Sequence, residues 1–242
     1  MSFFCMQSTE RPIKDVPGII LVFLATTLAL QIGWQSTQPP RVATAAALPP
    51  PPPLEKLRMF GLGDSVALSK MLMLWLQAFD NQPGISIPYR ELDYLAVTAW
   101  LEDILALDVR GQYPLFAASH LYSEVPDVSR QRQMLEFVYR KFSEDPDHRW
   151  PALAQAVFIA KHRLRDLPLA LRYARALTEH VTAGNVPFWV RQMQVWVLED
   201  MGELEDARIL LGGLLASGTI SDPHELMFLK QRLQQLATGA EK

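Results

Sequence analysis

No charged side chain occurs between Asp15 and Arg41, and this interval limits what the N-terminal part of the chain can become. Its apolar part, residues 16–34, reads VPGIILVFLATTLALQIGW. Nineteen residues of α-helix extend about 28 Å, close to the hydrocarbon thickness of a bilayer. Pro17 suits the first turn of such a helix, and Trp34 has the position of an interfacial aromatic. The segment predicts one transmembrane helix over residues 16–34, preceded by a short tail, residues 1–15.

Two other interpretations of this segment stay open. A cleaved signal peptide has a shorter apolar run and a nearby site of small residues, whereas the small residues ATAAA, 43–47, come well after Trp34. A buried core helix is the other interpretation, but nothing that flanks the segment looks like a domain. We therefore expect a retained membrane anchor.

Basic residues on the two sides of the segment indicate its orientation. Arg11 and Lys14 precede it, and only Arg41 follows it closely. Because basic flanks tend to stay in the cytoplasm, we expect a cytoplasmic N-terminus. The C-terminal domain of this single-pass protein would then face the periplasm, at a bacterial inner membrane. The alternative is the same protein with its domain in the cytoplasm.

A segment rich in proline and alanine follows the apolar segment. Residues 35–53 read QSTQPPRVATAAALPPPPP, with no aromatic residue and little that can pack. Consecutive prolines adopt polyproline II at about 3.1 Å per residue, so residues 49–53 alone would form a rod of roughly 15 Å. We expect a linker over residues 35–53 that holds the domain away from the membrane. A ligand for an SH3-type domain is the alternative.

Composition and motifs argue against several classes of function. The formal net charge is −3, whereas a nucleic-acid surface needs clustered basic residues. The single cysteine, Cys5, rules out an intrachain disulfide framework and a cysteine-based zinc site. The five histidines lack metal-binding spacing, and no GxSxG, phosphate-loop or dinucleotide motif occurs. We expect no metal, no cofactor, no catalytic residue and no nucleic-acid partner.

The remaining chain, residues 54–242, shows helical periodicity, with apolar residues three and four positions apart. Pro114, Pro151 and Pro187 are separated by 37 and 36 residues, and each lies near an aromatic residue. Each proline is expected to start an apolar helix at a position that tolerates proline. Each such helix is followed by a short turn and a second helix. This spacing predicts an all-α domain built from repeated helix pairs.

The three turns read VPDVSRQ, LRDLPLA and MGELEDA. The last resembles the tetratricopeptide repeat (TPR) family, in which a Gly-Asp-Tyr-like turn leads to an alanine four residues after the acidic one. Here Gly202 and Glu203 lead to Ala207, and in the preceding unit Asp166 leads to Ala170. The small side chain lets paired helices approach closely. Residues 91–108 look like the second helix of an upstream unit.

The resemblance covers residues 89–220 and implies a TPR-like helical-hairpin solenoid, of the membrane-anchored bacterial type. Some family positions that hold small residues carry large ones here, and the spacing exceeds the usual value of about 34 residues. Lengthened loops and an irregular solenoid are therefore expected. The replaced positions are Phe158, Leu177, Val195 and Leu214.

Three further stretches have structural interpretations. In SEDPDHRW, residues 143–150, the acidic residues fit a turn in which aspartate caps the next helix, although a metal site is conceivable. Gly212 and Gly213 indicate a close helix contact. In SDPHELMFLKQRLQQL, Asp222 and Glu225 fit the start of a terminal capping helix.

In TPR proteins the concave face is lined mostly by the first helix of each pair. By that register, six residues are expected to face a partner-binding groove: Gln155, His162, Arg163, Gln192, Trp196 and Glu199. Residues 65–79, SVALSKMLMLWLQAF, are unusually apolar and predict either a core helix or a helix that docks on a partner or membrane. The candidate contacts there are Met71, Met73 and Trp75.

These expectations combine into a membrane-anchored TPR-like adaptor that binds protein partners. We expect an accessory or assembly subunit of an envelope membrane complex. The alternative is an enzyme that acts on envelope polysaccharide or peptidoglycan through paired carboxylates. A deep pocket with convergent carboxylates would favour the enzyme, and an open groove would favour the adaptor.

Overall fold

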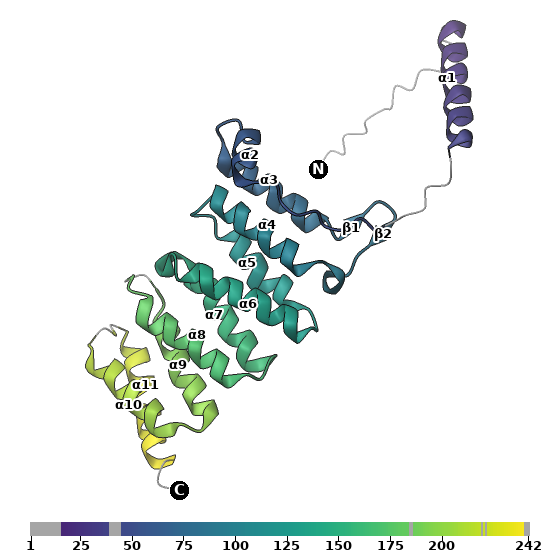
Figure 1. Cartoon of the computed structure of the whole chain (residues 1–242). Coiled ribbons are helices and arrows are strands. Elements are labelled where there is room, and N and C mark those ends of the chain that lie inside the picture. The colour runs from purple at the N-terminus through teal and green to yellow at the C-terminus, as the bar shows by residue number, and fades with distance from the viewer. Residues whose placement is uncertain (1–15, 39–44, 184–185, 219, 221, 240–242) are drawn as a thin grey trace, which may run out of the picture. The chain divides into compact units, whose positions relative to one another are not determined.

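The computed structural model describes residues 16–38, 45–183, 186–218, 220 and 222–239. It divides the chain into two compact units, Met1–Thr44 and Ala45–Lys242 (Figure 1). The predicted tail, Cys5, Arg41 and residues 43–44 of the small-residue run lie outside the described residues.

The described part of the first unit is essentially one helix, α1, Gly18–Thr37. It is long and apolar enough to cross a membrane, a description that a signal sequence near the N-terminus also meets. None of its residues is buried. The hydroxyls of Thr26 and Thr27 donate to carbonyls four residues earlier, at 2.8 and 3.0 Å, so these polar groups are satisfied within the helix. The helix continues three residues past Trp34.

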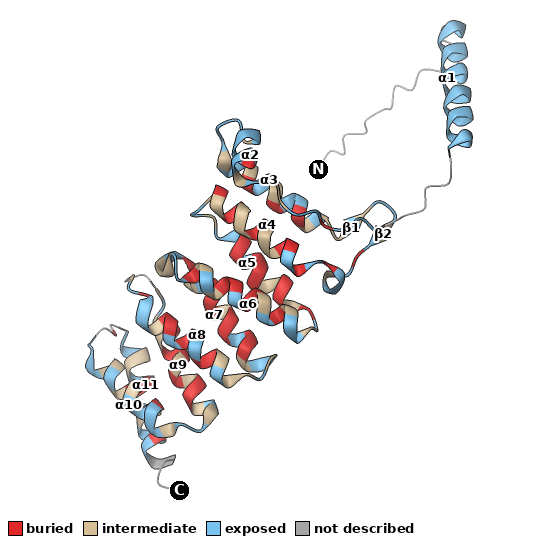
Figure 2. Cartoon of the chain, viewed as in Figure 1, coloured by how far each residue is buried: buried red, intermediate tan, exposed pale blue. Residues whose placement is uncertain are grey.

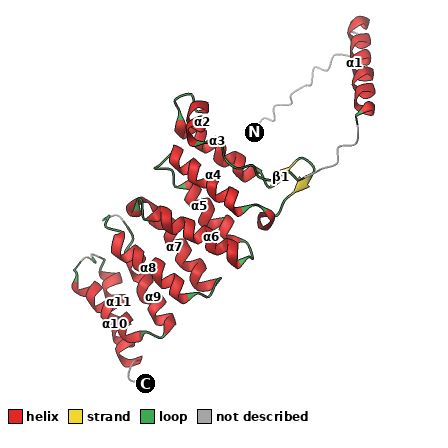
Figure 3. Cartoon of the chain, viewed as in Figure 1, coloured by secondary structure: helices red, strands yellow, loops and turns green. Residues whose placement is uncertain are grey.

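The second unit is mostly helical, as the periodicity predicted (Figure 3). One exception is the hairpin of β1 (Asn81–Gln82) and β2 (Ile85–Ser86), which turns through Pro83 and Gly84. Two short 3-10 helices, η2 (Tyr89–Glu91) and η3 (Tyr122–Glu124), precede α4 and α6. The helices are α2 Leu54–Phe60, α3 Ser65–Ala78, α4 Tyr94–Leu107, α5 Tyr113–His120, α6 Val128–Phe142, α7 Pro146–His162, α8 Leu167–His180, α9 Trp189–Met201, α10 Leu204–Ala216 and α11 Pro223–Gly239.

Aspartate side chains begin many of these helices. Each accepts a hydrogen bond from a backbone N–H of the first turn, which satisfies a donor that has no partner inside the helix. Asp222 caps α11 in this way, through the N–H of His224 at 2.9 Å, but Glu225 bonds to another helix and forms no capping box. The other capping residues are Asp64, Asp93, Asp127 and Asp166.

Consecutive helices pack as pairs, α3 with α4, α5 with α6, α7 with α8 and α9 with α10, and α11 packs on α10 (Figure 1). We call α3, α5, α7, α9 and α11 the first helices, and α4, α6, α8 and α10 the second helices. First helices also contact one another, α5 with α7 and α7 with α9. Buried residues line both the first helices α5, α7 and α9 and the second helices α4, α6 and α8 (Figure 2). Ala170 and Ala207, the turn alanines, are fully buried, so each lies where packed helices come close.

Polar contacts between helices recur at a similar separation along the sequence. Six of them join residues 33 to 36 positions apart, close to the spacing of one helix pair from the next, whereas Lys141–Glu102 and Lys161–Asp200 join residues 39 apart. The six pairs are Ser69–Ile104, Gln77–Tyr113, Thr98–Gln133, Glu136–Arg172, Asp147–Thr182 and Gln192–Glu225.

The three prolines whose spacing predicted the repeat lie at different positions relative to their helices. Pro114 lies in the first turn of α5, as predicted. Pro151 lies inside α7, because that helix begins five residues earlier and Pro146 occupies its first turn. Pro187 precedes α9, which begins at Trp189. The prediction that each proline starts its helix is therefore correct only for Pro114.

The proline-rich segment also differs from the prediction, because residues 45–53 pack on the helical unit. The side chain of Leu48 is only 7% exposed. The amide of Gln82 bonds to both the N–H and the carbonyl of Ala46, at 2.8 and 3.0 Å. The indole Nε1 of Trp100 donates to the carbonyl of Pro49 at 2.7 Å. We call residues 45–53 the strap. It lies against the domain and is no free spacer.

The structure also tests the predictions made for the Gly212–Gly213 pair and for the turn at residues 143–150. A Cβ atom built on Gly212 or Gly213 would meet nothing within 4 Å, so the predicted close helix contact at this pair is wrong. At the turn 143–150, Asp147 accepts hydrogen bonds from the backbone N–H groups of Thr182 and Ala183, at 2.7 and 2.9 Å. These bonds lower the pKa of Asp147 and give its carboxylate a structural role. Asp145, at the N-cap of α7, makes no side-chain cap bond and contacts His148 instead, so the predicted aspartate cap is wrong for this helix.

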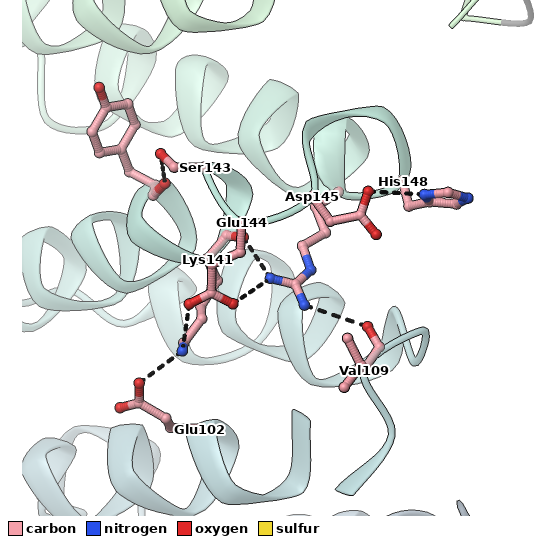
Figure 4. Close-up of polar contacts among 9 residues, drawn as sticks. Glu102, Val109, Lys141, Ser143, Glu144, Asp145 and His148 are labelled. Atoms are coloured by element: carbon pink, nitrogen blue, oxygen red, sulfur yellow. Dashed lines mark hydrogen bonds and ion pairs between the residues drawn. The ribbon is translucent and has the colours of Figure 1, made fainter. Parts of the chain in front are cut away.

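Arg149 anchors the same turn. Its guanidinium donates to the Lys141 carbonyl at 2.6 Å, to Glu144 Oε2 at 2.8 Å and to the Val109 carbonyl at 3.3 Å. Lys141 Nζ in turn pairs with Glu102 on α4 and with Glu144, both at 2.8 Å (Figure 4). Partial burial alone would raise the pKa of Glu144, but the bonds from Lys141 and Arg149 outweigh it and lower that pKa. The network joins α4, α6 and α7.

Candidate partner-binding face

Large apolar side chains that remain exposed are distributed unequally over the paired helices. Among the described residues, the first helices carry ten of them and the second helices three. A monomer normally leaves such side chains scattered, and their gathering on one set of elements indicates a binding surface. On the first helices they are Val66, Met71, Leu74, Trp75, Tyr113, Phe116, Phe158, Trp189, Met227 and Phe228; on the second helices they are Leu95, Val128 and Ile209.

The second helices present charge instead. On α6 and α8, Glu136 pairs with Arg172, whose guanidinium also lies over the rings of Tyr139 and Tyr173, 4.8 and 5.1 Å from their centroids. On the same surface, Arg132 of α6 pairs with Asp166, the residue that caps α8. The two sides of the helical unit therefore differ in chemistry, and the exposed apolar side chains define what we call the first-helix face.

Two Phe-x-x-x-His pairs lie on this face. Phe116 and His120 stack on α5, with ring centroids 4.2 Å apart and an interplanar angle of 15°. Phe158 and His162 repeat the arrangement at the end of α7, at 6.2 Å and 15°. The two phenylalanines are 46% and 40% exposed, so each ring keeps an accessible face. Residues four apart on a helix share one side, which explains both stacks.

Hollows lie between successive first helices. A hollow of about 380 Å³ lies between α3 and the start of α5, lined by Met73, Leu74 and Tyr113 among others. A smaller one of about 60 Å³ lies between α5 and α7, with Phe116 and His120 in its wall. Another, of about 140 Å³, lies between α9 and α11. These hollows make the first-helix face uneven.

The predicted groove residues on α7 have mixed outcomes. Gln155 is half-buried, and His162 is exposed and stacks on Phe158. Arg163 pairs with Glu124 and also donates to its carbonyl, at 3.4 Å, so it joins α7 to η3. Of the three, His162 is the residue that stays most accessible to a partner.

The predicted residues on α9 face α11 of the same chain. Gln192 is 4% exposed, and its Nε2 donates to Glu225 Oε1 at 3.0 Å. Glu199 accepts from Arg232 Nε at 3.0 Å. Trp196 is half-buried and lines the hollow between the two helices. The prediction that Gln192 and Glu199 line a free groove is therefore wrong, because the terminal helix covers this part of α9.

The three candidate residues on α3 differ in their exposure to solvent. Met73 is 3% exposed and belongs to the core, so it is not available to a partner. Trp75 is 39% exposed and packs on Trp100, with ring centroids 4.8 Å apart. Met71 points away from the core and is exposed. The helix is thus both a core helix and an exposed apolar one, on opposite sides.

The prediction missed Phe116, Phe158 and Trp189. The signal was present in FAASH and FIAKH, which place Phe and His four residues apart at the ends of α5 and α7. Phe158 was interpreted only as a departure from a family pattern. Trp189 forms an edge contact with Trp150, at 5.8 Å, which joins α7 to α9 and leaves one side of Trp189 exposed.

No protein-family model, curated protein or solved structure matches this chain. The chemistry of the first-helix face must therefore be judged from its own residues. Phe and Trp side chains bury roughly 150–250 Å² each and dominate the energetics of interfaces. A row of them on rigid helices favours the binding of an apolar or aromatic segment of another molecule.

Proposed function

We propose that this protein is a membrane-anchored adaptor that binds protein partners on its first-helix face. It would act as an accessory or assembly subunit of a bacterial envelope membrane complex, with α1 retained in the inner membrane and the helical unit in the periplasm. Its mechanism is binding, with no chemistry of its own. Anchoring would raise the effective concentration of the face near a partner in the same membrane.

The observation that carries this proposal is the unequal distribution of exposed apolar side chains. Ten of them lie on the first helices and three on the second helices, among the described residues. This distribution exposes apolar surface area to water mainly on the first helices, and a bound partner would remove that area from contact with water. At about 25 cal/mol per Å², covering two aromatic rings contributes several kcal/mol of driving force before the costs of association.

We also propose that the helical unit is a solenoid of the TPR type. Two observations support this: helices pack in consecutive pairs, and polar contacts recur 33 to 36 residues apart. A stack in which each unit contacts its neighbours produces this spacing. The Schellman-type turn at Gly202, with φ 80°, matches the glycine of the family's turn.

The polysaccharide-acting enzyme has less support. Glycoside hydrolysis needs two carboxyl groups on opposite sides of one substrate site. Two more hollows lie in the described part of the helical unit, one beside Glu179 and one beside Glu124, and each of the five is lined by at most one carboxylate. One of these, Glu199, is already paired with Arg232. We therefore propose the adaptor alone.

The test compares the two sides of the helical unit. The double variant Phe116→Ser with Phe158→Ser should lose most of the partner recovered when the full chain is crosslinked in its native membrane and purified. The matched control is Leu95→Ser with Ile209→Ser, which removes exposed apolar side chains from the second helices and should leave recovery unchanged. Thermal unfolding checks that both variants fold. Equal recovery from the two variants would contradict the first-helix face as the binding site.

Anchoring and orientation need a separate measurement. The intact mass of the purified chain shows whether α1 is retained, and a mass corresponding to a start beyond Trp34 would contradict the anchor. Alkaline phosphatase fused to the C-terminus should be active, because it needs the periplasm. A fluorescent reporter that folds only in the cytoplasm should stay dark. The opposite pattern would support the cytoplasmic alternative.

A further inference from the structure

An apolar surface at the start of the helical unit has a different character from the rest of the first-helix face. It continues from α2 through the turn onto the outer side of α3. Leu62, at the turn, is 94% exposed. We call this the N-terminal apolar surface, and its members are Met59, Phe60, Leu62, Val66, Met71 and Leu74.

The arrangement of α2 and α3 favours a helix that lies along a membrane surface over one that crosses it. The two helices together are apolar enough to count as a span, but they meet at an angle of 106°. The inner side of α3 is fixed in the core by Met73 and Leu76, and Ser69 Oγ donates to the Ile104 carbonyl at 3.0 Å. Only the outer side of α3 is free, which is the geometry of a helix that lies on an apolar surface.

Because the strap is held against the helical unit, it limits the length of free chain between the end of α1 and this unit. Gln82, four residues after the end of α3, holds Ala46, and Trp75 on the last turn of α3 packs on Trp100, which holds Pro49. The strap is therefore fixed beside the end of α3. Nine residues lead from the end of α1 to Ala46, and a fully extended chain of that length spans about 30 Å. This limit follows from the number of residues alone.

Charge favours lipid over a purely apolar protein pocket. Three basic residues, Lys56, Arg58 and Lys70, are exposed on the same two helices. Basic side chains beside an apolar surface bury their stems at a membrane interface and direct their charge to anionic headgroups. The acidic residues of this segment are Glu55 and Asp64, and Asp64 is occupied as the cap of α3.

We propose that the N-terminal apolar surface binds the interfacial layer of the bilayer in which α1 is anchored. This inference rests on the proposed retention of α1 as an anchor. It adds a second membrane contact to the molecule. It assigns three of the ten exposed first-helix side chains, Val66, Met71 and Leu74, to lipid together with Leu62, and leaves the other seven, Phe116 and Phe158 among them, for a protein partner.

The experiment uses the full chain with Cys5→Ser, reconstituted in vesicles of phosphatidylethanolamine with a minority of phosphatidylglycerol. Single cysteines at Leu62→Cys or Leu74→Cys carry an environment-sensitive fluorophore, and lipids with a spin label in the acyl chain act as quencher. We expect a shift of emission to shorter wavelength and loss of fluorescence at both positions. Ile209→Cys on α10 is the exposed control and should show neither effect. Leu24→Cys within α1 reports the anchor.

The outcomes separate the two proposals. Quenching at Leu24→Cys together with values at Leu62→Cys and Leu74→Cys equal to those at Ile209→Cys would overturn the surface contact and leave the anchor intact. Absence of quenching at Leu24→Cys would overturn the anchor itself. A change at Leu62→Cys in native membranes but not in lipid vesicles would assign the surface to a protein instead. In a Met71→Cys reporter, Leu62→Glu with Leu74→Glu should abolish quenching, whereas Ile209→Glu should not.

Discussion

At the scale of single residues, the structure gives the buried charged side chain of Arg149 an architectural role. Arg149 is buried, and it satisfies two backbone carbonyls and one carboxylate from segments that are far apart in sequence. The sequence indicated only that residues 143–150 form a turn rich in acidic residues. It could not show that Arg149 enters the core, because nothing local distinguishes it from a solvated arginine.

Replacing this residue should cost stability. Arg149→Met keeps much of the apolar stem but removes the guanidinium that donates to the Val109 carbonyl, to the Lys141 carbonyl and to Glu144, so we expect a loss of about 2–3 kcal/mol in the free energy of unfolding. Urea denaturation of the chain in detergent measures it. Arg110→Met, at an exposed position, should change stability by less than about 0.5 kcal/mol. Equal effects of the two substitutions would contradict the anchoring role.

At the scale of elements, the helices were the most predictable part, because three- and four-residue periodicity and aspartate caps are local signals. The strap was not predictable, because its contacts are made by the backbone of Ala46 and Pro49, and a proline-rich composition does not indicate where those carbonyls go. The start of α7 was also misplaced, since both Pro146 and Pro151 satisfy the sequence rule for a first turn. Tertiary packing decided between them.

The cap of α8 leads to a pH-dependent prediction. The backbone N–H of Leu169 and the guanidinium of Arg132 lower the pKa of Asp166 below its ordinary 3.8. Because the folded state holds the ionised form, this contribution is complete above the unfolded pKa and is lost as the pH falls through the folded one. Asp166→Ala should therefore cost about 1 kcal/mol near neutral pH and progressively less below the ordinary pKa.

Urea midpoints at neutral pH and at about pH 3 measure this difference. The control is Asp206→Ala, in the first turn of α10, where the side chain is exposed and makes no cap. A cost for Asp166→Ala that stays constant with pH would contradict an ionic contribution of the cap.

At the scale of the whole molecule, the proposed stack of helix pairs should respond locally to change, because each unit of such a stack contacts only its neighbours. A helix, α11, is present over the predicted terminal segment, and its Glu225 and Arg232 bond to Gln192 and Glu199 on α9, two residues predicted to line the groove. Sequence periodicity identifies the first helices. It cannot show whether a first helix is covered by the terminal helix, as α9 is by α11, or exposed to solvent. The first-helix face therefore had to be found from burial.

One substitution tests this locality. Arg232→Gln breaks the ion pair with Glu199 between α11 and α9, so amide hydrogen exchange should accelerate in α11 and α9 while α3 to α6 keep their rates. Arg208→Gln removes a pair that lies within α10, with Glu205, and should change exchange little beyond that helix. Acceleration spread evenly over the helical unit would contradict the stacked arrangement.

The strap also determines how the molecule would carry mechanical load. A pull on the polypeptide from its N-terminal side reaches the helical unit first at the paired amide bonds around Ala46 and then at the indole bond to Pro49. The force is therefore transmitted to the hairpin and to α4 before it reaches α2. The middle of α4 would bear the load, and the part of the strap between Pro49 and α2 would not be stretched.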